Sequence, residues 1–149
     1  LFRSKRIREE KMLINELINP QIISALSYCG HGSKVLIADG NYPLDEKTGN
    51  AKKVYLSLTA GNPTVTEVLS ALKTSVNIEK YTVMDPETGD IPEVYPLFEE
   101  ELSGIPYEKV SRSKFYELCN SSNDVKLAIL TGDIRTFSNI LLTIGVRNA

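Results

Sequence analysis

His31 is the one histidine of the chain, and it lies in the turn Gly30-His31-Gly32, eight residues before Asp39. Imidazole is the only side chain whose ordinary pKa lets it both donate and accept a proton near neutral pH. Residues 35–38 between the two are apolar, which predicts a short buried strand with Asp39 at its end. Ligands of open α/β sheets usually bind at the carboxyl ends of strands, so Asp39 is a candidate binding residue.

Two more predicted strands end in polar groups, with Arg112 after residues 107–110 and Asp133 after residues 125–130. His31, however, precedes the strand that Asp39 follows. Four strand residues at roughly 3.3 Å each separate the two by more than about 10 Å. Either the glycine-rich turn folds His31 back, or the two residues belong to sites completed by a neighbouring subunit.

Each candidate also has a structural interpretation. From the residues alone, His31 is more simply a surface or capping histidine, Asp39 is as readily a turn-forming residue before Gly40, and Arg112 is more simply a solvated charge. A Cys29–His31 nucleophile pair is not expected, because the Cys29 thiol falls on the apolar stripe of the preceding helix. The Gly30-His31-Gly32 turn is too short for a phosphate-binding loop.

The elements that must position these residues alternate between helix and strand. Asn19-Pro20 predicts a helix start, and Thr64 with Glu67 predicts a capping box. Further helices are expected at 92–102 and after a Ser113 cap, and further strands at 54–59, 79–84 and 140–146. This alternation predicts an α/β domain with helices packed around a central mixed sheet.

Composition narrows the functional classes. The 149 residues carry a net charge of −2, which gives no reason to expect nucleic acid or an anionic membrane as partner. No apolar run approaches the roughly 18 residues of a membrane span. One His and two Cys offer no multi-ligand metal site, and we expect Cys29 and Cys119 to be reduced and buried. Residues 1–11 read as an extension or solvated tail without a secretory apolar region, so we expect a cytoplasmic protein.

Longer motifs at both ends resemble a known family. Gly30-His31-Gly32, the apolar strand, and then Ala38-Asp39-Gly40-Asn41-Tyr42-Pro43 are similar to the opening motif of the ribose pyranase and fucose mutarotase (RbsD/FucU) family. The segment from Leu56 to Thr64 resembles the ribose branch, and Arg112-Ser113-Lys114-Phe115-Tyr116 the fucose branch. Residues 131–146, with Phe137-Ser138-Asn139 at their centre, resemble the family's closing motif. The similarity covers residues 12–147 and makes 12–149 the expected domain.

The resemblance implies an α/β fold in a ring-like homo-oligomer, an octamer or decamer, with each sugar site between neighbouring subunits. It implies cofactor-free interconversion of the anomers or ring forms of a ribose- or fucose-type monosaccharide. His31 would move the proton, Asp39 and Arg112 would hold hydroxyls, and Phe137, Ser138 and Asn139 would line the sugar. No metal or covalent intermediate is needed, because the reaction already proceeds in water.

The sequence departs from the family pattern in the closing motif. Phe137 stands where the family has tyrosine, and Asp133 stands where it has the longer glutamate. The missing phenolic hydroxyl suggests an alternative function, a non-catalytic sugar-binding or transport-associated regulatory protein. Tyr42 is the candidate for supplying a hydroxyl to the same pocket.

Overall fold

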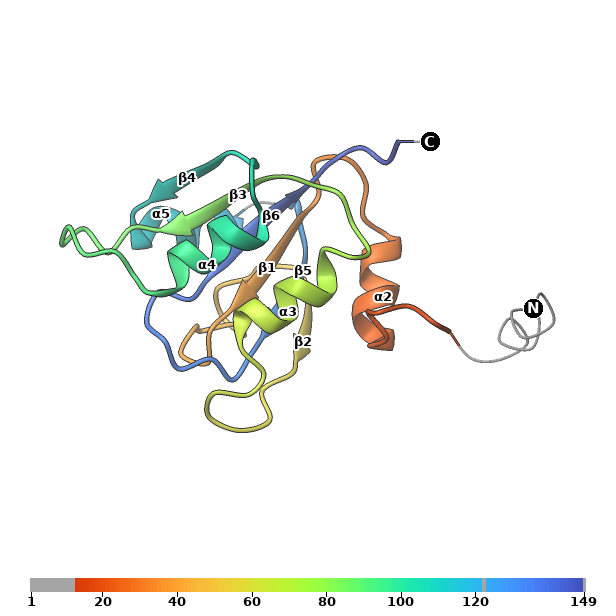
Figure 1. The fold of residues 1–149 in the computed structure, drawn as a ribbon, viewed down its shortest axis with the longest axis horizontal. Helices are drawn as coiled ribbons and strands as arrows, with labels where there is room; N and C mark the ends of the chain where they lie inside the picture. The colour runs from red at the N-terminus through yellow and green to blue at the C-terminus, as the bar shows by residue number, and fades with distance from the viewer. Residues whose placement is uncertain (1–12, 122, 149) are drawn as a thin grey trace.

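The computed structural model describes residues 13–121 and 123–148. The strands of these residues form one six-stranded sheet with the order β2-β5-β1-β6-β3-β4 (Figure 1). The strands are β1 Lys34–Ala38, β2 Lys52–Tyr55, β3 Ile78–Met84, β4 Tyr107–Val110, β5 Val125–Leu130 and β6 Ile140–Ile144. The β1–β5, β2–β5 and β3–β4 pairs are parallel, whereas β6 runs antiparallel to β1 and β3. The expected mixed sheet is therefore confirmed.

This topology decides which loops meet. Because only β6 is reversed, the carboxyl ends of the other five strands share one edge of the sheet with the amino end of β6. Asp39, Arg112 and Asp133 each follow one of those five strands, and Asn139 directly precedes β6. Loops at the carboxyl edge of such a sheet are the usual place for a ligand.

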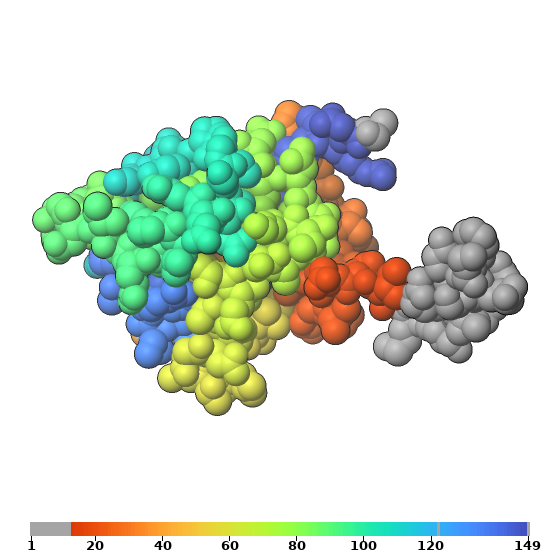
Figure 2. Space-filling model, viewed as in Figure 1, coloured from red at the N-terminus to blue at the C-terminus, as the bar shows by residue number. Residues whose placement is uncertain are grey.

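Four helices are described, and they cover the two faces of the sheet unequally. Helices α2 Pro20–Ser27, α3 Val65–Leu72 and α4 Val94–Glu101 contribute buried residues to one apolar cluster. Helix α5 Arg112–Ser121 packs on the opposite face, against a smaller cluster that includes Phe115 and Cys119. Figures 1 and 2 show α3 and α4 in front of the strands, with α5 behind them in Figure 1. No helix in the described part of the chain is long and apolar enough to cross a membrane.

Strand β1 serves both clusters. Val35 and Ile37 face the larger cluster, while Leu36 and Ala38 face the smaller one, as the alternation of side chains along a strand requires. All four side chains are fully buried. A strand buried on both faces cannot shift by a residue without exposing apolar surface, so the positions of His31 before it and Asp39 after it are well determined.

Most predicted elements are confirmed within a residue or two, including the Asn19 cap and the Thr64–Glu67 capping box. Three details are wrong. Helix α5 begins at Arg112, and the Ser111 side chain, not Ser113, accepts the Lys114 N–H. The strand predicted at 54–59 is β2, at 52–55. Cys29, which we expected to be buried on the apolar face of the helix, lies beyond the end of α2 and is half-buried. Both cysteines are free, as expected. The extension expected at 1–11 lies outside the described residues.

Candidate functional site

Residues from four segments of the chain line a cavity of about 170 Å³ at the carboxyl edge of the sheet, which we call the Asp39 cavity. Its lining residues come from the loops after β1 and before β6, from β3 and from α5: Asp39, Asn41, Tyr42, Met84, Arg112, Tyr116, Thr136, Phe137 and Asn139. Five of the seven residues predicted for the site are thus brought together. Ligand pockets usually enclose about 300–1,000 Å³, so this cavity is small for a site closed by one chain.

Asp39 and Asn139 form a reciprocal pair across the cavity floor. The backbone N–H of Asp39 donates to Asn139 Oδ1 at 2.8 Å, and Asn139 Nδ2 donates to Asp39 Oδ2 at 3.3 Å. Both side chains are buried, with exposed fractions of 4% and 5%. The two residues are 100 positions apart, so this pair joins the end of β1 to the start of β6.

The Asp39 carboxylate is held by the protein on several sides. Its Oδ1 accepts the backbone N–H of Asn41 at 3.0 Å, and the backbone N–H of Ser138 also donates to it. Burial raises the pKa of Asp39, the backbone donors oppose that change, and the nearby Asp133 adds to it. A carboxylate with a raised pKa in a small cavity is suited to accept hydrogen bonds from the hydroxyls of a ligand or to exchange a proton with them.

Arg112, Phe137 and Tyr116 also line the Asp39 cavity. The Arg112 guanidinium lies 5.8 Å from the centre of the Phe137 ring, and it makes no ion pair within the described residues. Phe137 adopts the left-handed backbone conformation with φ of 59°, which is strained for a residue with a large side chain. A cationic donor and an aromatic face beside a carboxylate suit a ligand that presents both hydroxyls and C–H groups.

Tyr42 and Ser138 lie differently from the other candidates. Tyr42 lines the cavity, but its hydroxyl donates to the backbone carbonyl of Lys47 at 3.1 Å, and burial raises its pKa strongly. Ser138 is fully buried, is not a lining residue, and its Oγ has no hydrogen-bond partner within residues 13–121 and 123–148. Ser138 contributes to the site through its backbone N–H, which donates to Asp39.

His31 is not part of this cavity. It lies at the opposite edge of the sheet, in a separate open cavity of about 480 Å³ formed by the end of α2, the residues before β3 and the residues after β6. The five residues of β1 span about 16 Å at 3.3 Å each, so one chain does not bring His31 to Asp39. His31 Nε2 is instead 2.8 Å from Glu79 Oε1.

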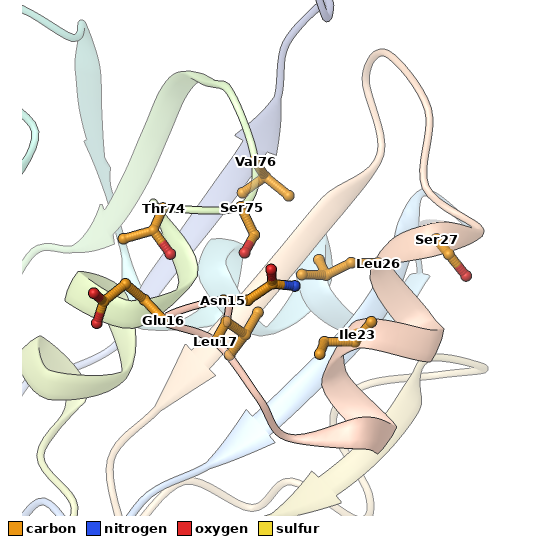
Figure 3. Close-up of a pocket in the computed structure, with 9 residues that line it drawn as sticks. All are labelled: Asn15, Glu16, Leu17, Ile23, Leu26, Ser27, Thr74, Ser75 and Val76. Carbon is orange, nitrogen blue, oxygen red and sulfur yellow. The ribbon is translucent and has the colours of Figure 1, made fainter. Parts of the chain in front are cut away.

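A third cavity, of about 500 Å³, adjoins the His31 cavity and shares Leu26, Ser75 and Val76 with it. Figure 3 shows Leu26, Ile23 and Leu17 between α2 and the turn that follows α3. Glu16 is the one charged residue that lines this cavity, so its lining brings no pair of acid–base side chains together. In the part of the chain that the structure describes, no group of three His, Cys, Asp or Glu side chains could hold a metal ion.

Asp133 anchors the loop that carries Phe137 and Asn139. Its buried carboxylate accepts the N–H of Val65 at the start of α3 at 2.9 Å and pairs with Arg135 Nη2 at 2.6 Å. Burial alone would raise the pKa of Asp133, but the hydrogen bonds from Arg135 and Val65 outweigh burial and lower it. The chain before this loop is equally fixed, because a Cβ at Gly132 would collide with the backbone oxygens of Thr59 and Asn62.

Tyr116 lines the cavity but is not among the predicted site residues, as is also true of Asn41, Met84 and Thr136. It lies one helical turn after Arg112 on α5, and both line the cavity. Its ring meets Tyr42 edge-on with centroids 5.4 Å apart, and its hydroxyl makes no hydrogen bond to a described residue. The i, i+4 spacing from Arg112 is the signal that would have identified it.

The sequence and the fold are similar to those of known proteins. Residues 12–147 match the model of the RbsD / FucU transport protein family. A curated D-ribose pyranase of Staphylococcus haemolyticus is 31% identical over 130 residues, covering 87% of this chain and 95% of that protein.

Solved structures show the same fold. RbsD of Bacillus subtilis, complexed with D-ribose, superposes with a TM-score of 0.81 at 26% identity, over 92% of this chain and all of that one. The fucose mutarotase of Streptococcus pneumoniae, in complex with L-fucose, superposes with a TM-score of 0.74 over 88% and 95% of the two chains. At 22% identity, the second comparison shows a shared fold.

The Asp133–Arg135 pair predicts a pH-dependent stability. Asp133→Asn should lower the free energy of unfolding by about 2–3 kcal/mol at pH 7, because Arg135 loses its buried partner. The folded-state pKa of Asp133 lies below the unfolded value of about 3.9, so the stabilisation is complete above that value. It is lost as pH falls through the folded-state pKa.

Urea denaturation of wild type and variant between pH 7 and pH 2 measures this, and the two curves should converge at the acid end. Glu117→Gln is the control, because it removes an exposed partner of Lys114 at 3.5 Å and should change stability little. A difference between wild type and Asp133→Asn that stays constant over the whole pH range would contradict the assignment.

Proposed function

The chain belongs to the RbsD / FucU transport protein family, and from this membership we propose that it interconverts the anomers or ring forms of a free monosaccharide without a cofactor. The substrate is a ribose- or fucose-type sugar. The observation that carries the proposal is the convergence of Asp39, Arg112 and Asn139 on one small cavity at the carboxyl edge of the sheet. The curated D-ribose pyranases that match most of this chain support the reaction class.

The reaction asks little of the protein. Opening a cyclic hemiacetal removes the proton of the anomeric hydroxyl, breaks the bond between the anomeric carbon and the ring oxygen, and delivers a proton to that oxygen. Closing on the other face, or through another hydroxyl, reverses these steps. A positioned acid–base group contributes about 10²–10⁴-fold. In our proposal His31 is that group, while Asp39, Arg112 and Asn139 hold the sugar hydroxyls.

His31 enters the site from a second copy of the chain. The distance of about 16 Å along β1 and the small volume of the Asp39 cavity both favour a site that one copy cannot complete. The described surface also exposes the apolar side chains of Leu13, Ile14, Ile18, Tyr28 and Val146, which a second copy of the chain would bury in an interface. We propose a ring-shaped homo-oligomer, an octamer or decamer, acting in the cytoplasm.

Sugar binding without catalysis is the second candidate function. Phe137 favours it, because the ring beside Arg112 has no hydroxyl to exchange a proton. Saturable binding of a monosaccharide by a chain that leaves its exchange rate unchanged would establish this second function over the first.

The role of His31 predicts the effect of one substitution. His31→Ala should slow the exchange between sugar forms by about 100-fold or more, because it removes the group that moves the proton. NMR saturation transfer on a panel of free pentoses and hexoses measures the rate for each sugar and also identifies the substrate. Native mass spectrometry of the variant checks that assembly is intact, and full activity in an intact assembly would exclude His31 from the reaction.

Tyr116 and Tyr42 predict a graded pair of effects. Tyr116→Phe should weaken sugar binding about tenfold, because its hydroxyl is free to bond a sugar. Tyr42→Phe should have a smaller effect, because that hydroxyl already donates to Lys47 and offers the sugar only a lone pair. Titrating the exchange rate against sugar concentration separates the two. An unchanged rate in Tyr42→Phe would show that its hydroxyl does not contribute.

A further inference from the structure

We infer that Glu79 is a positioning residue that fixes the tautomer and ring orientation of His31. The inference rests on the proposed function, in which His31 moves the proton. Glu79 lies at the start of β3, 48 residues after His31, and the two side chains meet at the edge of the sheet away from the Asp39 cavity.

The contact itself assigns the proton. Glu79 Oε1 lies 2.8 Å from His31 Nε2, and a carboxylate only accepts hydrogen bonds, so Nε2 carries the hydrogen. In the neutral ring Nδ1 is then the free base. The side chains are 59% and 45% exposed, and a pair this exposed contributes little to stability. The contact with Glu79 therefore matters for the orientation of the His31 ring.

Both residues stand on backbone that is tied to the end of β6. Gly32 N–H donates to the carbonyl of Ile144 at 2.9 Å, and Ile144 N–H donates back to Ser33 at 2.8 Å. On the other side, Gly145 N–H donates to the carbonyl of Asn77 at 2.7 Å. The turn of His31 and the start of β3 are thus held to the same two residues, which places the backbones of His31 and Glu79 side by side.

Gly145 provides the space that the Glu79 side chain occupies. A Cβ built on Gly145 would lie 3.1 Å from Glu79 Cβ and 3.3 Å from its Oε1, closer than ordinary van der Waals contact. A side chain at this position would displace the carboxylate that His31 bonds. A larger residue at position 145 would therefore require Glu79 and the neighbouring Asn77 side chain to shift by a few tenths of an ångström.

The arrangement suits a proton that must move twice. Nδ1 takes the proton of the anomeric hydroxyl, and the imidazolium that forms is stabilised by Glu79 on its other nitrogen. The anomeric oxygen becomes a carbonyl as the bond between the anomeric carbon and the ring oxygen breaks. Nδ1 then gives the proton to the former ring oxygen. Catalytic triads use the same arrangement, in which a carboxylate accepts a hydrogen bond from one ring nitrogen of a histidine while the other nitrogen transfers the proton.

The test uses the full chain with Glu79→Gln and Glu79→Ala, and Glu100→Gln as the control for loss of an exposed carboxylate on α4. We expect kcat for sugar exchange to fall about tenfold in both Glu79 variants with KM within about twofold, and Glu100→Gln to match wild type. Glu79 variants with wild-type kcat, measured on a wild type that is active, would overturn the role of Glu79 alone. A wild type that accelerates no exchange would overturn the proposed function instead.

The NMR signature of the imidazole gives a readout that does not depend on activity. His31 is the one histidine, so its ring nitrogens are identified without assignment. Wild type should show the form with hydrogen on Nε2, and Glu79→Ala should show a mixture of both tautomers. Identical tautomer populations in the two proteins would overturn the inference.

A double-mutant cycle connects Gly145 to the same mechanism. Gly145→Ala should lower kcat in the wild-type background, because the new Cβ displaces Glu79. In the Glu79→Ala background it should change kcat by less than about twofold, since the carboxylate is already absent. Equal losses in the two backgrounds would show that Gly145 does not act through Glu79.

Discussion

Reciprocal hydrogen bonds between Asp39 and Asn139 hold the candidate sugar site together. They join the carboxyl end of strand β1, whose last four residues are buried, to the amino end of β6, the one reversed strand of the described sheet. Because β6 is reversed, its first residues lie among the strand ends that carry Asp39 and Arg112. The Asp133–Arg135 pair then ties the intervening loop to α3, so that Phe137 keeps a strained backbone beside the cavity.

The other end of β6 holds His31 and Glu79, the residues of the proposed proton transfer. Ile144 and Gly145 bind the backbone on either side, and between them they present His31 and Glu79 at the opposite edge. One strand thus positions the proposed binding residues at its start and the proposed proton-transfer residue at its end. A strand of this length keeps the two apart, which is why the proposed reaction requires a second copy of the chain.

Sequence reasoning succeeded where a short local pattern decides the structure. The buried run before Asp39, the Thr64–Glu67 capping box and the alternation of elements all appear in the fold. Sequence reasoning failed where the neighbouring strand determines how long a strand can be. Residues 56–59 alternate like a strand, but the neighbouring strand β5 ends at Leu130, opposite Tyr55. The His31–Glu79 contact joins residues 48 positions apart, and no local pattern predicts it.

The central claim, that His31 of one copy serves the Asp39 cavity of another, has a direct test. His31→Ala and Asp39→Asn chains are each expected to be inactive alone, and co-expression should restore activity in the mixed assembly. A site that takes Asp39 from one variant and His31 from the other is intact, so random assembly predicts about a quarter of wild-type exchange by NMR. Mixed assemblies that form and remain inactive would contradict a site shared between copies.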